Sequence, residues 1–189
     1  MSSYTALLDA NVLYPAPMRD LLLQLAVMDV YRAKWTDDIH REWIDALLER
    51  EPHRRREDLE RTRGLMDQST RDAIVTDYAT LIPTLTLPDP DDRHVLAAAI
   101  VGRCDAIVTQ NLKDFPEEVL SRYGIEAQHP DEFLLNQMGL ELATFCQAVA
   151  KVRARLKSPP YSADEYLATL TRQGLVATAA ELRQFSALI

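Results

Sequence analysis

The sequence has few of the residues that build disulfide frameworks or zinc sites. It contains two cysteines, Cys104 and Cys146, which lie far apart, and four scattered histidines. A disulfide-rich domain needs more cysteines, and a structural zinc site needs cysteine or histidine ligands at regular spacing. We therefore expect reduced thiols and exclude a zinc centre of that kind.

Long apolar runs are also missing. No stretch is long enough to cross a bilayer, and the N-terminus lacks the basic region and apolar core of a signal peptide. Apolar residues make up 47% of the 189 residues and charged residues 26%, which is ordinary for a globular protein. We expect a cytoplasmic protein without a membrane partner, built as one α/β domain with an appendage.

Two acidic residues follow short apolar runs that are typical of buried parallel strands. Asp9 follows residues 4–8, and residues 105–109 lead through a polar turn to Asp114. Ligands bind at the carboxyl ends of strands in open α/β sheets, so both side chains are well placed for a site. A helix cap explains Asp9 equally well, and an Asp in a turn is usually only a turn former.

Two further acidic residues are expected on helices. In a helix over residues 38–50, Glu42 lies within an apolar stripe with Ile39 and Trp43, so we expect its carboxylate to face inward. A partly exposed Glu at the edge of the stripe is the alternative. Asp92 begins a helix and shares a face with Val95, and a simple capping role explains it as well as a ligand role.

Together the four carboxylates indicate a metal-dependent nuclease. Clustered carboxylates repel one another and raise one another's pKa unless cations are present. Mg²⁺ or Mn²⁺ prefers such oxygen ligands and keeps part of its water shell. His94 is a candidate neighbour of the ligands, although a polar residue in the first turn of a helix is the favoured reading.

Four segments, residues 7–13, 39–43, 88–99 and 105–115, resemble in order and spacing the PIN domain family, across about residues 4–135. That family is a Mg²⁺- or Mn²⁺-dependent ribonuclease fold used by VapC-type toxins of toxin/antitoxin pairs. The resemblance implies a central parallel sheet flanked by helices, an RNA substrate and a cognate antitoxin. It implies a catalytic set of Asp9, Glu42, Asp92 and Asp114, metal binding by the three Asp of that set, and polar supports at Asn11, Thr109 and Asn111.

Two positions within this pattern are open. Asp91 lies beside Asp92, and we choose Asp92 because its offset to the apolar face of the next helix is the expected one. Asn111 stands where some relatives have an Asp, so Asp114 either binds the metal directly or acts through water.

The net charge of −8 is unusual for a protein that holds RNA, because phosphates are generally contacted by Lys and Arg. Arg54, Arg55 and Arg56 form a candidate RNA-facing patch. Acidic residues follow them at once, so a solvated helix surface with internal ion pairs is the favoured alternative.

The expected layout is a PIN-like nuclease domain over residues 1–138 and an all-helical extension over residues 139–189. Strands are expected at 4–8, 81–87, 105–109 and 125–128, with a further short one at 31–36. Helices are expected at 18–29, 38–50, 56–68, 93–102, 130–138, 140–156, 163–172 and 177–188. We favour packing of the extension on its own domain over homodimerisation or antitoxin binding.

Two rival functions are considered. A phosphatase of the haloacid dehalogenase type also begins with a strand ending in Asp, but it normally has a second Asp where this chain has Asn11. A non-catalytic RNA- or partner-binding module is the other, and four intact acidic positions argue against it.

Overall fold

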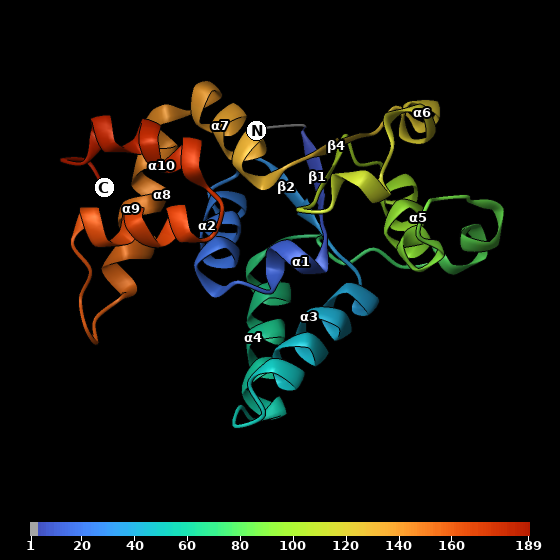
Figure 1. Ribbon diagram of the computed structural model, residues 1–189, viewed down its shortest axis with the longest axis horizontal. Helices are drawn as coiled ribbons and strands as arrows, with labels where there is room; N and C mark the ends of the chain where they lie inside the picture. Colours follow the sequence, from blue (N-terminus) through green and yellow to red (C-terminus); the bar gives the residue numbers. More distant parts are fainter. Residues whose placement is uncertain (1–3) are drawn as a thin grey trace.

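The computed structural model describes residues 4–189 and shows a parallel sheet covered by helices, with a helical extension on one side (Figure 1). Four strands form the sheet: β1 (Thr5–Leu8), β2 (Arg32–Lys34), β3 (Ala106–Val108) and β4 (Glu126–Gln128). Their order is β2-β1-β3-β4, and every neighbouring pair is parallel. The expected α/β class is confirmed, and residues 1–3 of the expected nuclease domain lie outside the described residues.

The helices of the nuclease domain flank this sheet. They are α1 (Ala10–Leu13), α2 (Ala16–Val27), α3 (Asp37–Arg50), α4 (Arg56–Ser69), α5 (Arg93–Val101) and α6 (Glu117–Leu120). Short 3-10 helices join them: η1 (Ala79–Thr84), η2 (Pro90–Asp92), η3 (Leu112–Asp114) and η4 (Ser121–Tyr123). In the part of the chain that the structure describes, no helix combines the length and apolar character needed to span a bilayer.

The strand predicted at 81–87 is wrong. Its first half belongs to η1, and Leu85 and Leu87 are buried without joining the sheet. Pro83 has no N–H to donate to a strand ladder, and the 3-10 helix that contains it packs on α5. The short strand predicted at 31–36 is confirmed as β2.

The central strands explain why polar residues gather at one edge. Every residue of β1 and β3 is buried, because helices cover both faces of the sheet. The ladder continues past the strand ends, where the Asp9 amide donates to the Val108 carbonyl at 3.1 Å and the Thr109 amide to the Gln128 carbonyl at 3.0 Å. Asp9 and Thr109 therefore leave adjacent strands side by side.

Most of α7 (Pro130–Leu140) lies within the expected nuclease domain, and the expected extension consists of α8 (Leu142–Arg155), α9 (Ala163–Arg172), α10 (Val176–Leu182) and η5 (Arg183–Phe185). It packs on its own domain, as favoured, through contacts of α8 and α9 with α2. Asp131 of α7 also accepts hydrogen bonds from the Ala177 and Thr178 amides, both at 2.8 Å, and so ties α10 to α7. The expected boundary at 138/139 falls in the last turn of α7, and the division into two domains stays a prediction.

Both cysteines are free and buried, so we expect the native protein to resist thiol reagents. Burial raises the pKa of Cys104 to about 12, and burial also raises the pKa of Cys146. The thiolate is the reactive form, so little of it exists at mildly alkaline pH. DTNB should leave both thiols unmodified in the native protein and modify two per chain in guanidinium chloride. Rapid modification of a thiol in the native state would contradict this burial.

Candidate functional site

Asp9 is held rigidly at the end of β1. Its side chain is buried, with Oδ1 accepting from the Ala10 amide at 2.7 Å and Oδ2 accepting from Asn11 Nδ2 and Thr109 Oγ1, each at 2.7 Å. Burial raises the pKa of Asp9, and the hydrogen bonds from Thr109 and Ala10 oppose that rise. Asp9 does cap α1, but its second oxygen also accepts from Thr109, which follows a different strand.

The three predicted supporting residues lie on one hydrogen-bond network around Thr109. Besides donating to Asp9, the fully buried Thr109 hydroxyl accepts from Asn11 Nδ2 at 2.9 Å and from the Asn111 amide at 3.0 Å. The Gln110 amide closes the network by donating to Asn11 Oδ1 at 3.0 Å. The turns after β1 and β3 are thus locked together, with the Asp9 carboxylate between them.

A cluster of three carboxylates lies beside this network. Asp89, Asp92 and Asp114 each offer an oxygen, and these oxygens all lie within 4.8 Å of one another. Asp92 stands at the N-cap of α5 but makes no capping hydrogen bond, so the simple capping role is contradicted. Burial, followed by the charges of Asp9, Asp89 and Asp114, raises the pKa of Asp92 to about 6, and His94 opposes the rise.

The choice of Asp92 over Asp91 agrees with this geometry. Asp91 is exposed, and its amide donates to Asp89 Oδ1 at 2.9 Å. Asp89 itself was not predicted as a site residue. The sequence did contain a signal for Asp89, because an Asp between two prolines at a helix start has a restricted backbone. Its closeness to Asp114, however, follows only from the fold.

Asp114 reaches the cluster from η3. It accepts a hydrogen bond from Asn111 Nδ2, so the Asn at this position orients a carboxylate. Because Asp114 belongs to the cluster, an ion bound to Asp92 would also be within reach of Asp114. Whether it binds directly or through water stays a prediction.

The expectation that Glu42 faces inward is wrong. The buried face of α3 consists of Ile39, His40, Trp43, Ile44 and Leu47, and the Glu42 side chain lies at its flank, 45% exposed. The inner side of its carboxylate is bound by His94 Nε2 at 2.7 Å. Burial lowers the pKa of His94, but the bond to Glu42 and the charges of Glu42, Asp38 and Asp9 outweigh it, so the net shift is upward.

His94 is therefore more than a polar residue of the first helical turn. It is mostly buried, and its charge acts on both Asp9 and Asp92. The sequence could not show the contact between His94 and Glu42. The two residues are 52 positions apart on different helices, and only the fold defines how these helices are placed.

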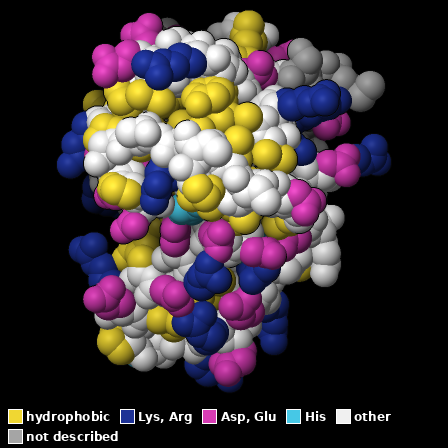
Figure 2. Space-filling view, turned by 90° about the vertical axis from the view of Figure 1, so that its right-hand side faces the viewer, with side chains coloured by type: hydrophobic (Ala, Val, Ile, Leu, Met, Phe, Trp, Pro, Cys, Tyr) yellow, Lys and Arg dark blue, Asp and Glu magenta, His cyan; other side chains and the backbone are white. Residues whose placement is uncertain are grey.

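The predicted basic patch is paired internally. Arg54 contacts Glu51 at 2.6 Å, Arg55 contacts Asp58 at 2.9 Å and Arg56 contacts Asp45 at 2.5 Å, all in exposed positions. Mixed charge of this kind also covers the face shown in Figure 2, where Asp and Glu form a row across the middle and Lys and Arg are interspersed below it. The alternative of a solvated surface with ion pairs fits these three residues, and their role in RNA binding stays a prediction.

The donor set fits a hard divalent cation. All of the clustered groups offer carboxylate oxygens, and in the described chain Asp92 has neither a hydrogen-bond donor nor an ion-pair partner to balance its charge. Oxygen ligands of this type suit Mg²⁺ or Mn²⁺ rather than Zn²⁺. Asp89, Asp92 and Asp114 are the residues that would hold such an ion, and metal binding by Asp9, whose charge acts on Asp92, stays a prediction.

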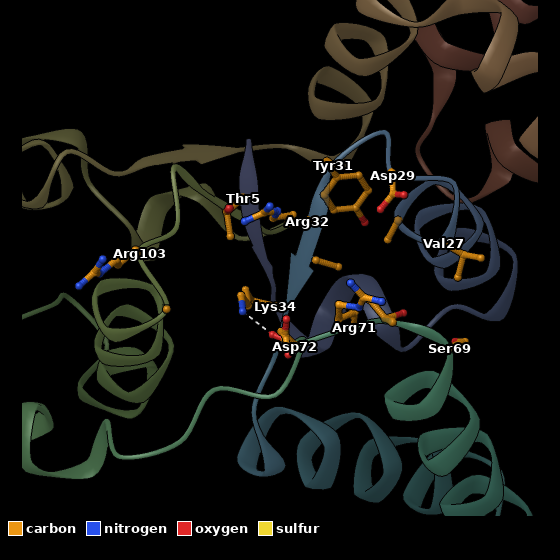
Figure 3. Close-up of a pocket in the computed structure, with 14 residues that line it drawn as sticks. Thr5, Val27, Asp29, Tyr31, Arg32, Lys34, Ser69, Arg71, Asp72 and Arg103 are labelled. Carbon is orange, nitrogen blue, oxygen red and sulfur yellow. Dashed lines mark hydrogen bonds between the residues drawn. The ribbon is translucent and has the colours of Figure 1, made fainter. Parts of the chain in front are cut away.

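A larger hollow lies at the opposite, amino-terminal ends of the strands (Figure 3). It has a volume of about 700 Å³ and contains none of the predicted site residues. Four cations line it: Arg32, Lys34, Arg71 and Arg103. The acidic site and this basic hollow thus occupy opposite edges of the sheet.

Comparison with known proteins agrees with this geometry. A PIN domain family model matches residues 5–113, and a model of the VapC50 C-terminal domain matches residues 130–184. A Mycobacterium tuberculosis protein named "Putative ribonuclease VapC50" is 47% identical over 83 residues, which are 43% of this chain and 48% of that protein. The match thus spans about half the length of that relative, and no solved structure matches. Because the PIN domain model covers more than half of its residues, the chain belongs to the PIN domain family.

Proposed function

We propose that this chain is a Mg²⁺- or Mn²⁺-dependent endoribonuclease, and that it is the cytoplasmic toxin of a type II toxin/antitoxin pair. The observation that carries the proposal is the group of carboxylates around Asp92, which accepts no hydrogen bond and forms no ion pair among the described residues. The ribonuclease in the name of the Mycobacterium tuberculosis relative supports RNA as the substrate. The VapC-like extension supports a cognate antitoxin as the partner.

The chemistry is hydrolysis of a phosphodiester. A water oxygen forms a bond to phosphorus, one bridging P–O bond breaks, and the leaving oxygen takes up a proton. A divalent ion at this site would supply activation of water and neutralisation of charge on the phosphate oxygens. Asp89, Asp92 and Asp114 would hold it, and the network around Thr109 keeps Asp9 in place beside them.

Glu42 is the residue that accepts the proton of the attacking water. Its carboxylate is open to solvent on one side and bound to His94 on the other, so a proton taken up there is close to a second titratable group. No side-chain nucleophile is required, because the attacking group is water.

The test is cleavage of total cellular RNA by the purified protein with Mn²⁺, Mg²⁺ or EDTA. We expect cleavage with either metal, none in EDTA, and loss of cleavage in Asp9→Asn and Asp92→Asn variants. A folded protein that binds Mn²⁺ and cleaves no RNA would instead favour the non-catalytic binding module. The phosphatase alternative is disfavoured, because position 11 is an Asn whose amide donates to Asp9 and, unlike a carboxylic acid, cannot protonate a leaving group.

A further inference from the structure

A groove of about 580 Å³ leads from the acidic site to the helical extension. One wall belongs to α3, where Glu42, Ala46 and Arg50 follow one another at four-residue spacing on one face. The other wall is formed by Arg172 and Gln173 at the end of α9. Residues from the nuclease domain and from the extension therefore face each other across one groove.

The groove opens directly at the candidate catalytic residues. Glu42 at its inner end is bound to His94, and Asn11, which also lines it, donates to Asp9. Arg50 lies eight residues after Glu42, which corresponds to about 12 Å along a helix axis. If one phosphate of an RNA chain lies at the acidic site, the neighbouring phosphates of that RNA are therefore within reach of this groove.

The cations of the groove are free to bind phosphate. Arg50 and Arg172 are exposed, and neither forms an ion pair with a carboxylate of residues 4–189, whereas Arg54, Arg55 and Arg56 all do. A hydrogen bond of 2.7 Å from Arg172 Nη2 to Thr169 Oγ1 orients the Arg172 guanidinium. Its remaining N–H groups stay available as donors.

An aromatic side chain also lines the groove. Tyr14 is partly exposed there, so part of its side chain is accessible to a base. Trp43 lines the same groove but is fully buried, and the Arg19 guanidinium already covers its ring at 5.0 Å from the centroid. Of these two rings, Tyr14 is the one that a base can stack on.

We propose that this groove binds single-stranded RNA beside the scissile phosphate, with Arg50 and Arg172 on backbone phosphates and Tyr14 against a base. The helical extension is then part of the RNA-binding surface of the enzyme. This inference rests on the proposed ribonuclease function. It assigns substrate positioning to Arg172 instead of to Arg54, Arg55 and Arg56, which are paired with carboxylates.

The test measures binding of a short, fluorescently labelled, single-stranded RNA of mixed sequence to the full chain in EDTA, by anisotropy over a range of salt concentrations. We expect Arg172→Ala to weaken binding about five- to tenfold. We also expect the slope of log K against log salt to fall by about 0.7, the value for one lost phosphate contact on a single strand. Arg172→Lys, which keeps the charge, should recover most of the slope.

The matched control is Arg71→Ala, which removes an exposed arginine from the basic hollow at the far edge of the sheet (Figure 3). Its RNA binding should equal that of the wild type. Unchanged RNA binding by Arg172→Ala would overturn the inference, and it is the result expected if a protein partner occupies the groove instead. An equal loss of RNA affinity in Arg71→Ala would also overturn it. Because binding is measured without metal, absence of cleavage by the wild type would refute the proposed function and leave this result standing.

Discussion

Asp92→Asn is expected to abolish RNA cleavage and yet to stabilise the metal-free protein. Cleavage should fall at least about a hundredfold, because the variant loses a carboxylate from the centre of the cluster with Asp89 and Asp114. The free energy of unfolding without metal should rise by about 1 kcal/mol, because the amide of Asn carries no charge for the neighbouring carboxylates to repel.

The sign of the stability change follows from the pKa of Asp92. The native state raises it from 3.8 to about 6, so between these values the native protein binds more protons at this position than the unfolded chain does. Ionised Asp92 therefore destabilises the metal-free fold, and this penalty is absent below about 4, grows between about 4 and about 6, and is constant at higher pH. A shift of about two pKa units corresponds to about 3 kcal/mol, which solvent screening at this half-buried carboxylate reduces to about 1 kcal/mol.

The measurement is urea unfolding in EDTA at neutral and at mildly acidic pH, paired with RNA cleavage in Mn²⁺. The gain in stability should shrink at the lower pH, where the wild-type carboxyl is protonated as well. Asp91→Asn is the matched control: Asp91 is exposed and outside the cluster, so its replacement should change stability by less than about 0.5 kcal/mol and leave cleavage intact. A destabilised Asp92→Asn, or equal effects of the two variants, would contradict the assigned cluster.

Phe133→Ala is expected to destabilise the protein by about 3–5 kcal/mol, the usual cost of removing a fully buried aromatic ring. Phe133 is completely buried on α7, where its ring meets the edge of Tyr31 at a centroid distance of 4.9 Å and lies 6.4 Å from the ring of Tyr4. Tyr31 directly precedes β2. The ring therefore joins α7 to the edge of the sheet.

Thermal and urea unfolding of Phe133→Ala check this expectation. Leu140→Ala is the control, since Leu140 is 75% exposed at the end of the same helix and its replacement should cost less than about 0.5 kcal/mol. A single cooperative transition at lower stability would mean that α7 and the sheet unfold together. A loss below about 1 kcal/mol would show that the contact between α7 and β2 contributes little.

The strand ends were the most predictable part of the site. The apolar runs before Asp9 and Thr109 are buried on both faces, so their pattern alone predicts parallel strands, and the carboxyl ends of neighbouring parallel strands meet at one edge. The family resemblance added Asn11 and Asn111, and the structure places both on the network around Thr109. The apolar segment at 81–87 misled the prediction, because Leu85 and Leu87 are buried outside the sheet, and apolar residues buried outside a sheet have the same composition as those of a buried strand.

The sequence by itself determined the fold class, the edge of the sheet that carries the site, and the presence of Asp9, Asp92 and Asp114 there. Only the tertiary structure decided that Asp89 completes the cluster, that Glu42 is bound to His94 at the flank of α3, and that Arg172 faces Arg50 across a groove. The physical reason is the range of the interactions. Burial and strand periodicity act along a few neighbouring residues, whereas these contacts join elements whose relative positions follow from packing of the whole core.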